Sequence, residues 1–184
     1  MKMIEVDGAS LAYEDSGRRH GPAVLLVNAL GTDFGLWDEQ RVTLERSFRV
    51  LRFDVRGHGK STNSVGPLSA ARSIDSLVYD ACAVLDAARV ERAHWCGLAL
   101  GGMTAMRAAT LVPQRVARLV LANTAAYFPL TGTWDARIEL VLRELAGPEP
   151  KDSPPIAGGK PGGPNTPQIQ NRHQMLVRLC GDKD

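Results

Sequence analysis

A glycine-flanked turn near the middle of the chain has the spacing of a catalytic motif. The segment Gly97-Leu98-Ala99-Leu100-Gly101 matches the pattern G-x-S-x-G except at its centre. In that pattern a serine lies on a sharp turn between a strand and a helix, with its hydroxyl exposed for attack on a carbonyl carbon. Here the central residue is Ala99, whose methyl group cannot act as a nucleophile. The spacing therefore predicts a scaffold for acyl transfer, while the residue type removes the attacking atom.

Two further polar segments, residues 28–33 and residues 54–61, also follow predicted strands. The second contains Asp54 and His58, the two side chains with the right chemistry for acid–base work. We interpret both as structural: Asp54 follows a strand and is placed to brace the tight turn after it, and His58 belongs to that turn. Cys96 ends a predicted buried strand, where a thiol is usually inert.

The elements that position these segments alternate between strand and helix. A hairpin with strands at 4–6 and 11–14 is predicted around Asp7-Gly8. A continuous apolar run at 23–27, typical of a strand buried on both faces, is followed by further buried strands predicted at 50–53, 93–96 and 116–122. Helices are predicted, by apolar spacing, over 36–47, 74–88, 100–112 and 134–145. This alternation predicts an α/β fold with a mostly parallel sheet and helices on both faces. Ligands bind such sheets at the carboxyl ends of the strands, where the three polar segments lie.

Composition narrows the class of protein further. The chain has 184 residues, of which 44% are hydrophobic and 23% charged, with 22 basic and 20 acidic side chains. This balance gives no strong field for a nucleic acid or a membrane surface, and no apolar run approaches a transmembrane span. No signal-peptide pattern is recognisable at the N-terminus. The three cysteines are odd in number and far apart, which argues against a disulfide framework. We therefore expect a cytoplasmic protein without a metal site.

The chain changes character near residue 146. Residues 147–167 contain seven prolines and five glycines, a composition that cannot bury enough apolar surface to hold itself together. We expect a folded core over residues 1–146 and a disordered tail over residues 147–184. His173 lies in this tail, and we do not expect it to act as a catalytic base.

Several segments together resemble the α/β-hydrolases and, among them, the 3-oxoadipate enol-lactonases. The likeness covers about residues 4–145. It is carried by Val27-Asn28-Ala29-Leu30-Gly31-Thr32-Asp33, Trp37-Asp38, Leu51-Arg52-Phe53-Asp54, Arg56-Gly57-His58-Gly59, Cys96-Gly97-Leu98 and Ala122-Asn123-Thr124-Ala125-Ala126.

This resemblance implies a serine hydrolase that opens an enol-lactone to a 3-oxo diacid in the bacterial breakdown of aromatic compounds, without a cofactor. A serine at position 99 would attack the lactone carbonyl while a histidine and an aspartate activate it. The backbone N–H groups of Leu30 and Leu100 would hold the oxyanion. Trp134 and Arg137 would begin the helix over the substrate, where the guanidinium could pair with a substrate carboxylate. The alternative for Arg137 is an ordinary exposed position on a helix.

Two departures from the family pattern change the expected activity. The nucleophile position holds Ala99, and no residue matches the aspartate and histidine that the family places after later strands. We therefore expect a C-terminally truncated fold that is inactive or has residual activity. Three accounts stay open: a lactonase whose coding sequence is cut short or shifted in frame near residue 146, a pseudoenzyme that binds a ligand or a partner, and a deliberately disabled variant.

Truncation would also leave a sheet edge without its neighbour. In the family arrangement the strand over residues 116–122 is interior, and its seven residues are mostly apolar. Such an edge, with unpaired backbone donors and acceptors, invites another chain to pair with it. We therefore expect self-association through this strand.

Overall fold

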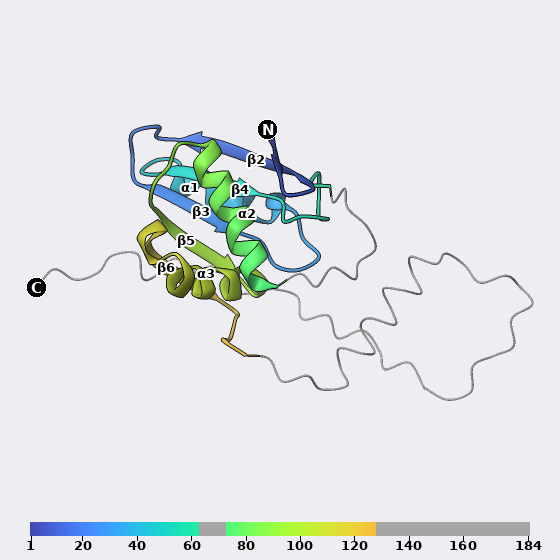
Figure 1. Cartoon of the computed structure of the whole chain (residues 1–184). Helices are drawn as coiled ribbons and strands as arrows, with labels where there is room; N and C mark the ends of the chain where they lie inside the picture. Colours follow the sequence, from blue (N-terminus) through green and yellow to red (C-terminus); the bar gives the residue numbers. More distant parts are fainter. Residues whose placement is uncertain (63–72, 128–184) are drawn as a thin grey trace, which may run out of the picture. The chain divides into compact units, whose positions relative to one another are not determined.

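The computed structural model describes residues 1–62 and 73–127 (Figure 1). Its six strands form one sheet in the order β1-β2-β4-β3-β5-β6. The strands are β1 (Lys2–Val6), β2 (Ala9–Gly17), β3 (Ala23–Val27), β4 (Arg49–Phe53), β5 (Ala93–Leu98) and β6 (Val116–Ala122). The α-helices are α1 (Asp38–Leu44), α2 (Ile74–Ala87) and α3 (Leu100–Leu111), and the 3₁₀ helices are η1 (Phe34–Trp37) and η2 (Pro113–Arg115).

The sheet is mixed, with its parallel part in the centre. β1 and β2 form the predicted hairpin, and its two turn residues, Asp7 and Gly8, both have positive φ angles of 36° and 73°. That geometry is the one that two-residue hairpin turns require. β2 also pairs antiparallel with β4, whereas β3 pairs parallel with both β4 and β5, and β5 pairs parallel with β6. The predicted α/β fold with a mostly parallel sheet is confirmed.

Helices cover both faces of the sheet, as predicted. Alternate residues of a strand point to opposite faces, and Leu25 of β3 and Leu51 of β4 belong to the main core cluster together with apolar side chains of α2 and α3. Arg52, the next residue along β4, points the other way and contacts Asp38 at the start of α1. Figure 1 shows α2 and α3 lying along one face of the strands.

The observed boundaries differ from the predicted ones at two places that matter for the site. β5 runs to Leu98 rather than ending at Cys96, because Gly97 still pairs with Val27 of β3 and Leu121 of β6. The helix predicted over 36–47 is instead the short 3₁₀ helix η1 followed by the shorter α1. The predicted helix over 134–145 and the predicted tail over 147–184 lie outside the described residues.

Candidate active site at the carboxyl ends of the strands

The turn between β5 and α3 has the backbone of a nucleophile elbow. Ala99, which joins the two elements, has φ 50° and ψ −110°. Residues with a side chain rarely adopt positive φ, and holding one there costs on the order of 1–3 kcal/mol. The chain thus keeps the strained turn at the position where the attacking hydroxyl is absent.

The glycines around this turn are required by close contacts between backbones. A Cβ atom on Gly97 would lie 2.2 Å from the carbonyl oxygen of Gly101, and a Cβ on Gly101 would lie 2.1 Å from the carbonyl oxygen of Val27. Both distances are far below van der Waals contact, so no larger residue fits without moving the main chain. The second contact also places the first turn of α3, and with it Leu100, directly against the end of β3.

The loop after β3 begins with a tight turn that carries Leu30. The backbone N–H of Thr32 donates to the carbonyl of Ala29 at 3.3 Å, and the Thr32 hydroxyl donates to the same oxygen at 2.8 Å. Gly31 has a φ of 75°, which a type II turn requires at its third residue. Leu30 is 47% exposed, so its apolar side chain faces solvent at the carboxyl end of the sheet.

Asn28 and Trp37 anchor this loop in the core. The Asn28 side-chain amide donates to the carbonyl of Phe53 at 3.1 Å, and its oxygen accepts from Trp37 Nε1 at 2.8 Å. Asn28 is fully buried, and Trp37 is 2% exposed. Because the amide meets a donor and an acceptor, its burial leaves neither polar end unpaired. The bonds fix the start of the loop to β4 and to the end of η1.

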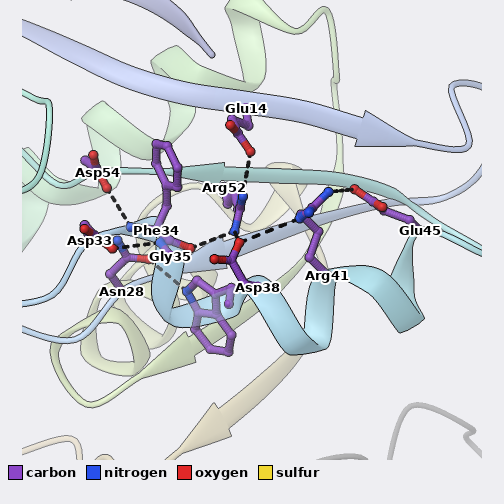
Figure 2. A network of polar contacts seen from close by, with 11 residues as sticks. Glu14, Asn28, Asp33, Phe34, Gly35, Asp38, Arg41, Glu45, Arg52 and Asp54 are labelled. Carbon is purple, nitrogen blue, oxygen red and sulfur yellow. Dashed lines mark hydrogen bonds and ion pairs between the residues drawn. The ribbon is translucent and has the colours of Figure 1, made fainter.

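Two side chains from the end of β4 hold Phe34, at the far end of the same loop (Figure 2). The Phe34 N–H donates to Asp54 Oδ1 at 2.6 Å, and its carbonyl accepts from Arg52 Nη1 at 3.0 Å. The Arg52 guanidinium also lies 4.8 Å from the centre of the Phe34 ring, within the range of a cation–π contact. Both polar residues are almost completely buried.

Arg52 is itself held by carboxylates from two elements. It donates to Glu14 of β2 at 2.7 Å and to Asp38 of α1 at 2.6 Å (Figure 2). Burial lowers the pKa of Arg52, but the hydrogen bonds to Asp38 and Glu14 more than offset this, and the pKa lies above its ordinary value. Arg52 is therefore a permanently charged side chain that supports the loop through its contacts with Phe34.

Asp54 braces the following turn, as we predicted. Its Oδ2 accepts from the Lys60 N–H at 2.8 Å, and its carbonyl oxygen accepts from the Ser61 hydroxyl at 2.6 Å. His58 Nδ1 lies 3.2 Å from the carbonyl oxygen of Arg56, a contact within the turn that fits a structural role. Asp54 has a second function that the sequence did not predict, because its bond to Phe34 ties this turn to the loop after β3.

The cysteine beside the elbow has a weakly acidic, unreactive thiol. Cys96 lies on β5, three residues before Ala99, and burial raises the pKa of its thiol to about 11. That value agrees with the prediction of an inert cysteine. Within the described ranges no group of three His, Cys, Asp or Glu side chains is placed to hold a metal ion. Trp134 and Arg137 lie outside these ranges.

Thr124, which the sequence did not single out by itself, contacts the elbow directly. It follows β6 by two residues, and its hydroxyl donates to the carbonyl oxygen of Ala99 at 2.7 Å. Its position after a parallel strand, at the same sheet edge as the elbow, is the sequence signal that could have found it.

Comparison with known proteins decides the family. The family model described as alpha/beta hydrolase fold matches residues 22–148, which include the elbow, the loop after β3 and the turn after β4. The chain belongs to the α/β-hydrolase fold family.

Members that this α/β hydrolase resembles include lactonases. It is 36% identical over 141 residues to 3-oxoadipate enol-lactonase 2 of Acinetobacter baylyi, covering 77% of this chain and 51% of that protein. Among solved structures, a hydrolase from Pseudomonas aeruginosa superposes with a TM-score of 0.70 at 44% identity, covering 77% of this chain and 52% of that one. The enol-lactonase from Burkholderia xenovorans superposes with a TM-score of 0.65 at 35% identity, covering 77% and 58% of the two chains.

The match involves only part of each relative. The chain spans about half the length of the curated lactonases that it matches. Among the described residues no helix is long and apolar enough to cross a membrane. The matched half contains the elbow that positions a nucleophile in this family, and the residue at its apex is Ala99.

Proposed function

We propose that this chain is an enol-lactonase-like α/β hydrolase that binds a small lactone or ester and turns it over at a residual rate at most. The observation that carries the proposal is the backbone of Ala99, which keeps φ 50° and ψ −110° without the side chain that uses this strain. An alanine in an ordinary loop would gain from relaxing to negative φ. The retained turn is that of a hydrolase, and its apex lacks the nucleophile.

Binding depends on groups that the loss of the serine leaves in place. The backbone N–H groups of Leu30 and Leu100 are the proposed oxyanion donors, and the amino end of α3 adds its partial positive charge. The contact of Gly101 with the end of β3 holds the two donor segments against one another. Trp134 and Arg137 are the proposed contacts to the rest of the substrate.

The proposed substrate follows from the lactonase relatives. It is a lactone or ester with a free carboxylate, which an arginine recognises through charge-assisted hydrogen bonds. Opening of 3-oxoadipate enol-lactone, a step in the breakdown of aromatic compounds, is the reaction proposed for a complete catalytic triad on this scaffold. Attack at the lactone carbonyl requires a serine at position 99, a base and an orienting carboxylate.

A binding module without catalysis is the second candidate function. Ala99 favours it, because a methyl group at the apex leaves the backbone donors in place and supplies no nucleophile. The two candidates share the same ligand site and differ only in turnover.

Titration calorimetry with adipate, a six-carbon dicarboxylate, tests the proposed site. We expect weak binding, about tenfold weaker in Arg137→Ala, because one charge-assisted bond is lost. Arg107→Ala is the matched control: this arginine lies on α3 and pairs with Asp75, and its removal should leave adipate affinity unchanged. Absence of binding in the unmodified chain would overturn the proposed function, and equal affinity in Arg137→Ala would remove Arg137 from the site.

A further inference from the structure

The end of β6 holds the elbow residue from both sides. The backbone N–H of Ala99 donates to the carbonyl of Ala122 at 3.0 Å, and the carbonyl of Ala99 accepts from the Thr124 hydroxyl at 2.7 Å. The same carbonyl accepts from the Met103 N–H at 3.1 Å, the first main-chain bond of α3. Both backbone groups of the strained residue are therefore fixed, one of them by a side chain.

A turn directly after the end of β6 brings Thr124 to this position. Asn123 has a φ of 44°, the left-handed conformation that asparagine adopts more readily than most residues. The chain turns there, so that Thr124 also packs on the first turn of α3. A Cβ atom on Gly102 would lie 2.5 Å from Thr124 Cγ2, which shows how closely the threonine methyl sits on that glycine.

We propose that Thr124 is a positioning residue for the side chain at position 99. The hydrogen bond of its hydroxyl to the Ala99 carbonyl opposes relaxation of the positive φ. It thereby keeps the Cβ atom of residue 99 directed relative to the backbone N–H groups that begin α3. Without that bond, the turn would lose one of its restraints, and the side chain would move away from the amino end of the helix. This inference rests on the proposed function only in taking position 99 as the nucleophile position.

A thiol introduced by Ala99→Cys reports the position of side chain 99 at the amino end of α3 through its pKa, and no catalysis is needed. A cysteine at a helix amino end has a pKa lowered from about 8.5 to between about 3.5 and 7.5. We therefore expect iodoacetamide labelling of the elbow thiol, followed by mass spectrometry against pH, to give a lowered thiol pKa. Cys96, whose pKa is about 11, reacts slowly at these pH values, and Cys180→Ser in the background removes a further thiol.

Two substitutions of Thr124 then separate its hydroxyl from its methyl group. Thr124→Val keeps the shape and removes the hydroxyl, and we expect the acid dissociation constant of the elbow thiol to fall about three- to tenfold. Thr124→Ser keeps the hydroxyl and should leave that constant unchanged. Thr110→Val, the same chemical change at an exposed position of α3, is the matched control and should have no effect on it.

The possible results separate the role of Thr124 from the proposed function of the elbow. If the pKa of the elbow thiol is not lowered in Ala99→Cys alone, the elbow is contradicted as a nucleophile site, and with it the proposed function. A lowered pKa that Thr124→Val leaves in place would overturn the role of Thr124 alone. A large change in the pKa of the elbow thiol in Thr124→Ser would also overturn the role of Thr124, even where the valine variant fails to fold. Thermal unfolding of each variant separates loss of positioning from loss of stability, because a merely structural threonine would lower the melting temperature without moving the thiol pKa.

Discussion

The N–H of Phe34 donates to the carboxylate of Asp54 at 2.6 Å, and this single bond joins two loops at the carboxyl edge of the sheet. The other oxygen of the same carboxylate accepts from Lys60. Asp54 is 1% exposed, so both bonds form away from water, where leaving a partner unsatisfied is costly. Asp54 therefore helps to position the loop that carries Leu30, together with Asn28 and Arg52.

Replacing Asp54 by asparagine should loosen both loops. The amide offers one oxygen acceptor where the carboxylate offers two, so one of the two backbone N–H donors is left unpaired. We expect a loss of about 1–3 kcal/mol in the free energy of unfolding, measured by urea denaturation. Hydrogen exchange should accelerate most in residues 29–36 and 57–61.

Asp33→Asn is the control for that experiment. Asp33 caps η1 by accepting from the Gly35 N–H at 2.8 Å, and asparagine caps as well as aspartate. The same chemical change one residue before Phe34 should thus be nearly neutral. Equal stability of the Asp54→Asn and unmodified proteins would show that Asp54 does not brace these loops.

Much of the fold could be predicted because its signals are local. The apolar residues of β3 and β4 mark strands buried on both faces, and Asp7-Gly8 marks the hairpin. β2 extends beyond its predicted end at Glu14 to Gly17, because the polar Asp15 pairs across the sheet with Arg49 at 2.8 Å. That partner is far away in the sequence, so the alternation of polar and apolar residues alone could not reveal it.

Part of the candidate site can likewise be predicted from the local sequence, and part cannot. The spacing of Gly97, Ala99 and Gly101 predicts the elbow, since close backbone contacts exclude any other residue at the two glycines. The bonds of Asp54 to Phe34 and of Thr124 to Ala99 depend on which strands are neighbours. They join residues 20 and 25 positions apart, and no local pattern encodes them.

Cys96 should be almost unreactive in the folded protein at neutral pH. With a thiol pKa of about 11, about one molecule in a thousand carries the thiolate at pH 8, and only the thiolate reacts. Iodoacetamide labelling at pH 8, followed by mass spectrometry of the peptide, should be at least about tenfold slower in buffer than in urea.

The cause of that raised pKa is burial, so reactivity should return as the chain unfolds. Cys82, whose pKa burial also raises, provides an internal comparison on α2. Equal labelling rates of Cys96 in buffer and in urea would contradict the partly buried position of this thiol on β5.

We also propose that the chain self-associates through β6. Among the described strands β6 forms one edge of the sheet, and Leu121 on it is 43% exposed. Light scattering across a concentration series should show dimers or larger species. Leu121→Lys should shift the distribution toward monomer, because a charge on an edge strand disfavours pairing.

Tyr79→Lys is the control for the light-scattering series. It introduces the same charge at a large exposed side chain, 56% exposed, on α2 instead of on the edge strand. We expect it to leave association unchanged. A monodisperse monomer of the unmodified chain, with a sharp thermal transition, would rule out association through β6.

We propose that the elbow is retained on a scaffold without a working triad. The most direct test of this proposal is the initial rate of hydrolysis of a simple aryl ester, measured for the unmodified chain and for Ala99→Ser. Ala87→Ser, an exposed position on α2, serves as the control. Triad residues act as a unit, so a hydroxyl restored without its base and carboxylate should raise the rate by less than about a thousandfold. A rise of about a thousandfold or more would contradict the account, because it would mean that a residue already in this chain activates the serine.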